Sequence, residues 1–246
     1  MNAAETIRDA VARVAALRQL SASSPSLLAA VTSVKGLQAR RFSGTYRDLL
    51  ATREYGAAAR FFLVELYSEK DYSQRDAQFA RIAGALQRIF PAQVVGTAVA
   101  LAQLHVLTEE FDYAMAASWL QSKSTVNNEV DRYLSVWQSV GRSEDRSKQL
   151  NLVIEIGSEL ERLTRTPGLR LMLRMMRRPA MATGLGALQS FLEAGFDTFA
   201  GMSAQRGRAT KFLEMIRERE ATLMAQLFAT ETAIGRDALT SHLRIE

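Results

Sequence analysis

The sequence contains no cysteine and only two histidines among its 246 residues. Without cysteine the chain can form no disulfide, no thiolate metal site and no cysteine nucleophile. The two histidines, His105 and His242, are too few for a multi-histidine metal centre within one chain. The sequence therefore excludes mechanisms that need a cysteine or a metal centre built from several histidines of one chain.

The sequence also lacks a long apolar run and a leader-like N-terminus. The richest apolar stretch, Val94 to Val106, is shorter than the roughly 18 residues of a membrane span and contains Gln103 and His105. Residues 1–9 do not place a cationic head before an apolar run, as a signal peptide would. We therefore expect a cytoplasmic protein.

Alternation of apolar and polar residues, the pattern of a strand, is hard to find in this sequence. Apolar residues instead recur at spacings of three and four, which predicts an all-α fold of about ten helices and no sheet. Ser24 followed by Pro25 predicts the start of a helix, and Gly141 predicts the end of one. The clearest expected helices cover roughly residues 92–121, 126–140, 169–178 and 208–228. Pro179 is expected to open a further helix that includes Gly184 and runs through Phe199.

No internal repeat and no linker rich in proline, glycine or serine divides the chain. We expect one main all-α domain at residues 41–230. Residues 1–40 are expected to form a loosely attached helical arm, and residues 231–246 a C-terminal tail.

The positive charge is mild in amount and unusual in kind. The net charge is +5, and 26 of the 31 basic residues are arginine. Arginine favours bidentate contacts with carboxylates and phosphates, but a high arginine content also follows from GC-rich coding sequence, so both explanations stay open. A net charge of this size does not by itself predict a nucleic-acid partner.

The strongest local asymmetry is a short cationic stretch. Its arginines recur at i, i+4, i+7 and i+8, which places them on one side of a helix. Cationic helices can bind anionic membranes or phosphates, but this one would be only about 15 Å long. It has no tryptophan or phenylalanine anchor and no aromatic residue for base stacking. The candidate interaction-surface residues are Arg170, Arg174, Arg177, Arg178, Met175 and Met176.

The string Phe61-Phe62-Leu63-Val64-Glu65-Leu66-Tyr67 resembles the signature of the bacterial FFLEELY-motif proteins. Neighbouring blocks are similar too, among them Arg75-Asp76-Ala77-Gln78-Phe79 and Phe191-Leu192-Glu193-Ala194-Gly195-Phe196. The string departs from the family name at Val64, where the family has glutamate. The resemblance implies a helical bacterial protein and no particular activity.

His105 is the single residue that could carry chemistry near neutral pH inside a helix. Glu109 follows it by four residues and Asp112 by seven, on the same face. Such a pair could be structural, could hold a metal, or could act as a general base, and a lone histidine could also bind haem. A ferritin-like centre is excluded because residue 102, three before His105, is alanine. The candidate ligand-pocket residues are Phe61, Phe62, Glu65, Tyr67, His105 and Glu109.

These observations favour a non-catalytic helical protein-interaction or regulatory module that uses the arginine and methionine surface of residues 169–181. Its expected partner is another protein or a second copy of itself, with an anionic membrane or nucleic acid less favoured. The alternative is a small-ligand binder with an apolar pocket between the 54–69 helix and the His105 helix, where haem or a lipid-like molecule would bind. An enzyme using His105 and Glu109 is a weaker third hypothesis. We expect no catalytic residue, no metal ligand and, haem aside, no cofactor.

Overall fold

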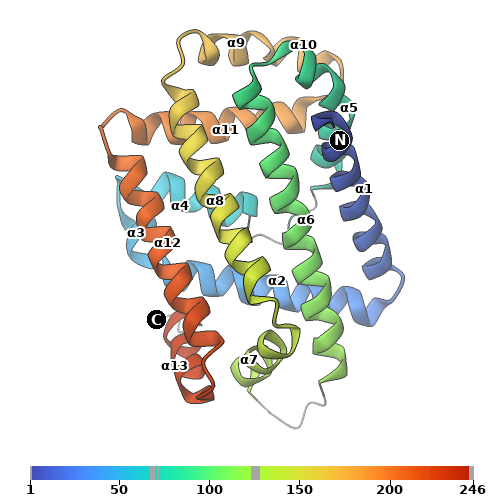
Figure 1. Cartoon of the computed structure of the whole chain (residues 1–246), viewed down its shortest axis with the longest axis vertical. Coiled ribbons are helices and arrows are strands. Elements are labelled where there is room, and N and C mark those ends of the chain that lie inside the picture. The colour runs from blue at the N-terminus through green and yellow to red at the C-terminus, as the bar shows by residue number, and fades with distance from the viewer. Residues whose placement is uncertain (1, 67–69, 71, 123–127, 244–246) are drawn as a thin grey trace. The chain divides into compact units, whose positions relative to one another are not determined.

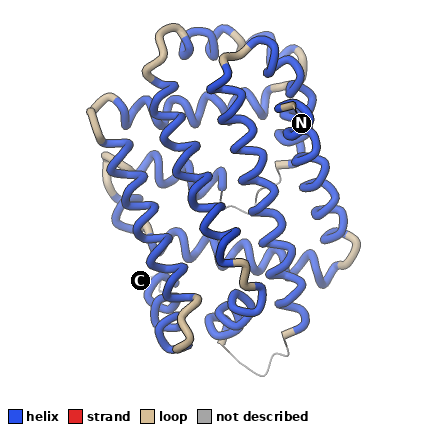
Figure 2. Tube along the Cα trace, viewed as in Figure 1, coloured by secondary structure: helices blue, strands red, loops and turns tan. Residues whose placement is uncertain are grey.

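The computed structural model describes residues 2–66, 70, 72–122 and 128–243. Within these ranges the elements of regular secondary structure are helices joined by loops, with no strand, as Figure 2 shows. The all-α prediction is therefore confirmed. The helices are α1 (Ala3–Ala22), α2 (Pro25–Thr45), α3 (Arg47–Ala51), α4 (Gly56–Leu66), α5 (Ser73–Ile89), α6 (Ala92–Gln121), α7 (Glu129–Val140), α8 (Ser143–Thr164), α9 (Leu169–Met175), α10 (Arg177–Ala182), α11 (Gly186–Ser203), α12 (Arg208–Leu227) and α13 (Thr232–Leu243) (Figure 1).

Several helix boundaries follow the local signals in the sequence. The Ser24 hydroxyl accepts a hydrogen bond from the Leu27 backbone N–H, and Pro25 is the first residue of α2. Gly141 ends α7 with a φ of +60°, a conformation that glycine adopts without the strain of a Cβ. The predicted long helix at 92–121 coincides with α6.

The expected single cationic helix at residues 169–178 is two short helices. Helix α9 ends at Met175, and α10 begins at Arg177 with Pro179 inside its first turn. Gly184, with a φ of +69°, then separates α10 from α11. The prediction that Pro179 opens a long helix was therefore wrong, because the turn at Gly184 intervenes. The arginine stripe is correspondingly divided, with two arginines on each short helix.

The chain forms two compact units. Unit 1 comprises Met1–Ala15, Lys70–Val106 and Leu152–Glu214, and unit 2 comprises Ala16–Glu69, Leu107–Asn151 and Met215–Glu246. Helices α1, α6, α8 and α12 contribute residues to both units. This division differs from the predicted arm, domain and tail.

In unit 1, small residues let helices approach closely. One core cluster combines Ile7 and Ala10 of α1 with Ala83 of α5 and Ala102 of α6. Five of this cluster's seven buried members are alanines, two in α1, one in α5 and two in α6. Such close packing leaves little room for a larger side chain. Helix α11 packs on α5, and the Gln78 side chain of α5 accepts a 2.8 Å hydrogen bond from the Leu188 N–H in the first turn of α11.

In unit 2, the core is built around large side chains. Tyr133 and Trp137 of α7 stack at 6.1 Å between ring centroids, and Trp137 meets Phe228 at 5.8 Å. Val34 of α2 and Leu239 of α13 are fully buried in the same cluster. Residues from both the predicted arm and the predicted tail thus help to build this core, and the tail contains helix α13.

Candidate functional site

Helices α9 and α10 of unit 1 expose apolar side chains to solvent. No residue of α9 is buried, and α10 buries only Ala180. The exposed fractions are 62% for Leu171, 69% for Met175 and 63% for Met181. Large apolar side chains exposed this far are informative when they lie together in one segment. This segment, residues 169–182, is called the α9–α10 surface below.

Two of its four arginines attach the α9–α10 surface to α11, which packs against both short helices (Figure 1). Arg170 donates to Asp197 at 2.8 Å, and Arg177 donates to both carboxylate oxygens of Glu193, the shorter bond being 2.7 Å. The hydrogen bonds from Arg177 lower the pKa of Glu193, so the carboxylate stays ionised. These pairs hold the short helices in place.

The other two arginines are differently placed. Within the part of the chain that the structure describes, Arg174 and Arg178 make no hydrogen bond or ion pair, and both are exposed. Met176, another of the predicted surface residues, is 38% exposed. The α9–α10 surface therefore presents two available guanidinium groups beside exposed leucine and methionine side chains. The predicted interaction residues do lie on one exposed segment.

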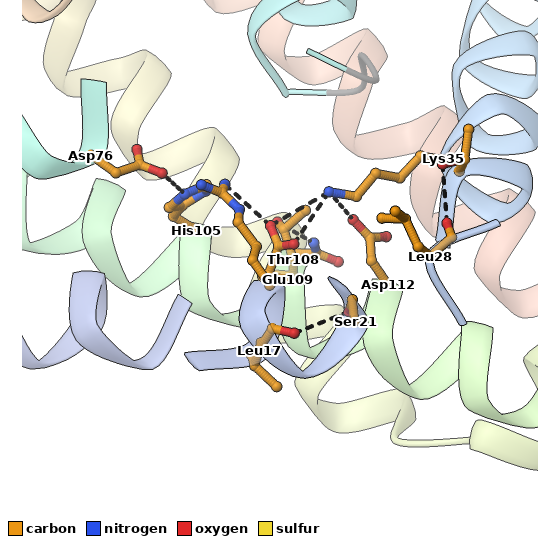
Figure 3. Close-up of polar contacts among 12 residues, drawn as sticks. Leu17, Ser21, Leu28, Lys35, Asp76, His105, Thr108, Glu109 and Asp112 are labelled. Atoms are coloured by element: carbon orange, nitrogen blue, oxygen red, sulfur yellow. Dashed lines mark hydrogen bonds and ion pairs between the residues drawn. The ribbon is translucent and has the colours of Figure 1, made fainter. Parts of the chain in front are cut away.

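His105, in unit 1, pairs with a carboxylate from another helix. Its Nε2 lies 2.8 Å from Oδ2 of Asp76, the buried aspartate in the first turn of α5 (Figure 3). The neighbouring Arg75 lies 3.6 Å from the same carboxylate, and its guanidinium packs over the rings of Tyr72 and Phe191. Two of the sequence blocks that resemble the FFLEELY-motif family thus meet here, the one at residues 75–79 and the one at 191–196. The local pairing expected between His105 and Glu109 did not anticipate this partner.

Glu109, in unit 2, lies in a buried charge cluster. It accepts hydrogen bonds from Arg18 and Lys35, both at 3.3 Å, and Lys35 also lies 3.5 Å from Asp112 (Figure 3). Burial raises the pKa of Asp112, an effect that the neighbouring Lys35 charge opposes. The histidine and the glutamate that the sequence placed on one helical face therefore have separate partners.

The remaining pocket candidates lie in helix α4 of unit 2. Phe61 and Phe62 contact each other edge to face at 6.3 Å between ring centroids, and Phe62 is buried. Glu65 is half-buried on the same helix, and Tyr67 lies outside the described residues. The structure assigns these residues and His105 to different units. The predicted pocket therefore stays a prediction.

Sequence reasoning missed the buried polar groups of unit 2. Arg146 is buried with its guanidinium 3.4 Å from the Trp137 ring centroid and 4.2 Å from that of Phe111. Burial lowers the pKa of Arg146 to about 10, so the group stays charged at neutral pH. Its Nε, Asp112 Oδ1 and Trp137 Nε1 are buried without a hydrogen-bond partner among the described residues. No local pattern marks Arg146, because it lies in the first turn of α8, where a solvated side chain is expected.

A second buried network joins α2 to α12 in unit 2. Glu220 accepts a 2.5 Å hydrogen bond from Arg41 and a 2.9 Å hydrogen bond from the Tyr46 hydroxyl. Tyr46 is fully buried, and the two charged groups are nearly so. Arg219, next to Glu220, donates to both oxygens of Asp48 at 2.7 Å. This network fixes the end of α2, and residues 41 and 220 are too far apart in sequence for any spacing rule to pair them.

His242 gives this region a dependence on pH. It lies in the last turn of α13, and burial, followed by repulsion from Arg41, lowers its pKa. The folded state therefore binds this proton less readily than the unfolded state does. We expect stability to fall as the pH drops below about 6.5, the usual histidine pKa, and through the lowered value. Urea unfolding of wild type and His242→Gln between pH 7.5 and pH 5 should show a smaller loss in the variant. Equal slopes would contradict this.

The structure offers no ready-made metal site or membrane span in its described part. No group of three or more histidine, aspartate or glutamate side chains there is arranged to hold a metal ion. Among the same residues no helix combines the length and the apolarity needed to cross a bilayer.

Comparison with known proteins places the chain in a family. No curated protein and no solved structure matches it. A family model described as "Domain of unknown function (DUF8198)" matches residues 17–234, which is most of the chain. The chain therefore belongs to the DUF8198 family.

Proposed function

We propose that this protein is a non-catalytic interaction module that docks a partner protein on the α9–α10 surface. The observation that carries the proposal is the exposure of Leu171, Met175 and Met181 together on two short helices. Apolar side chains exposed to this extent lower the solubility of a protein, and their burial by a partner is favourable in free energy. Methionine side chains adapt to irregular contacts, which suits a docking surface.

The way α9 and α10 are held supports the same proposal. Arg170 and Arg177 bind carboxylates of α11, so the segment is anchored through its polar groups while its apolar side chains stay exposed. In addition, Gln189 of α11 donates a 2.7 Å hydrogen bond to the Leu173 carbonyl. A pre-positioned surface loses less conformational entropy on binding than a mobile one.

Site-specific photocrosslinking in cells of the source organism tests this function. A photoreactive amino acid replaces Met175 in one variant and Lys148, an exposed residue of unit 2, in the control. We expect a discrete crosslinked species from position 175 and not from position 148. Adding Leu171→Ser and Met181→Ser should remove that species. If no species forms, or if both positions give the same one, the α9–α10 surface is not the docking site.

The ligand-binding alternative has weaker support. An axial haem ligand needs a ring nitrogen available to the iron, and Nε2 of His105 is engaged with Asp76. The fold assigns the other pocket candidates to unit 2, and Arg18 and Lys35 bind Glu109 there. The interaction module is therefore the function that the geometry supports best.

A further inference from the structure

The excess positive charge of this protein belongs to one of its two units. Unit 1 contains fifteen lysines and arginines against ten aspartates and glutamates, whereas unit 2 contains sixteen of each kind. The whole net charge of +5 therefore lies in the unit that carries the α9–α10 surface. A partner that approaches unit 1 meets a positive field.

Within unit 1, arginine is concentrated in the stretch of sequence that contains this surface. Residues 162–192 contain six arginines and no aspartate or glutamate, and four of these arginines bind carboxylates outside the stretch. In unit 2, by contrast, the basic side chains of α2 bind carboxylates: Lys35 and Arg41 do so in the interior and Arg40 does so at the surface. On the α9–α10 surface the carboxylates of α11 neutralise Arg170 and Arg177 and leave Arg174 and Arg178 available.

The two available arginines differ from those that hold the surface in place. Arg174 follows Leu171 by three residues and Arg178 precedes Met181 by three, so each cation is a near neighbour of an exposed apolar side chain on its own helix. A ligand that covers these apolar side chains therefore also lies beside the two guanidinium groups. It must supply groups that pair with them. Carboxylates satisfy them with paired, charge-assisted hydrogen bonds.

We propose that the α9–α10 surface binds an acidic amphipathic segment of a partner protein, and this rests on the proposed function. The apolar side of the segment covers Leu171, Met175 and Met181, and its carboxylates pair with Arg174 and Arg178. Charge complementarity selects this occupant. Residues 169–182 contain no aromatic residue that would stack on bases or anchor a helix in a bilayer.

A designed peptide provides the probe. It is an amphipathic helix of about 20 residues, with leucines on one face and glutamates on the other, carrying a fluorophore for anisotropy titration. Two matched peptides replace every glutamate with glutamine or every leucine with serine. We expect the acidic leucine peptide to bind best and its affinity to fall as the salt concentration rises. Both matched peptides should bind at least about tenfold more weakly.

Two charge-matched variants locate the binding site. Arg174→Glu with Arg178→Glu reverses the available pair, and Arg53→Glu with Lys148→Glu makes the same change in net charge on exposed residues of unit 2. The first variant should weaken binding of the acidic peptide at least about tenfold, and the second should leave it within about twofold. Circular dichroism checks that both variants keep the helical content and melting temperature of the wild type.

Several outcomes would overturn the inference. One is equal affinity for the acidic and the glutamine peptides, and another is equal weakening in both variants. Binding to phosphatidylserine–phosphatidylcholine vesicles in place of the peptide would identify a membrane surface instead. If the peptide fails while position 175 still crosslinks to a discrete partner, the acidic class is wrong and the interaction module stands. If crosslinking fails as well, both are wrong.

Discussion

Replacing Gly44 by alanine should destabilise unit 2 by about 3 kcal/mol, a large share of the stability of a typical domain. Gly44 lies near the end of α2, where this helix packs against α13. A Cβ added there would overlap the backbone carbonyl oxygen of His242 and lie 2.6 Å from its carbonyl carbon. Both obstacles are backbone atoms, so no side chain can rotate away, and α13 would have to move.

Gly96→Ala provides the control for this substitution. Gly96 is exposed inside α6, and a Cβ added there meets nothing within 4 Å. Alanine should therefore stabilise the helix by about 0.5–1 kcal/mol through its higher helix propensity. Urea denaturation followed by circular dichroism measures both variants. If Gly44→Ala and the wild type unfold with the same midpoint urea concentration, the close approach of α2 and α13 is wrong.

The sequence contained most of what was needed to place the helices. Spacings of three and four, together with the Ser24-Pro25 pair and Gly141, mark boundaries that depend on nearby residues only. The chain departs from the prediction where the signals are weak. The break between α9 and α10 occurs at Met176, which no rule of composition marks. Gly184, which the sequence predicts to lie inside a helix, has a positive φ and forms a turn between α10 and α11.

Contacts between distant residues could not be predicted in the same way. Helical periodicity pairs residues three or four apart, so it offered Glu109 as a partner for His105, whereas Asp76 is 29 positions away in sequence. The exposed arginine and methionine residues of the α9–α10 surface were anticipated because they share one short segment. Their division into an anchoring pair and an available pair depends on α11, which only the folded structure supplies.

The end of α2 concentrates several of these distant contacts within unit 2. Between residues 41 and 48 the chain meets α12 through Glu220 and Arg219 and meets α13 through the His242 carbonyl. The C-terminal helix therefore contributes to the fold even though its sequence resembles a tail. A defect at this junction should affect α2, α12 and α13 together.

Replacing Glu220 by alanine should destabilise the protein by about 3–5 kcal/mol, since it removes the carboxylate that the buried Arg41 guanidinium binds. Arg41 would lose its carboxylate while its side chain stays buried, and the Tyr46 hydroxyl would lose its acceptor. Tyr46→Phe removes only the hydrogen bond from the hydroxyl to this carboxylate and should cost about 1.5–3 kcal/mol. Urea unfolding at pH 7.5 measures both variants.

The double variant Arg41→Met with Glu220→Leu separates the cost of removing the Glu220 carboxylate alone from the net stability that the ion pair contributes. Burying two apolar side chains of similar volume removes both desolvation penalties, so replacement of a whole buried pair is often neutral or stabilising. We therefore expect the double variant to regain most of the stability that Glu220→Ala loses, although the Tyr46 hydroxyl still lacks its hydrogen bond to Glu220. If the double variant is as unstable as the single one, the ion pair itself stabilises the junction. If Glu220→Ala costs less than about 1 kcal/mol, Arg41 reaches solvent and the network is not buried as the structure shows.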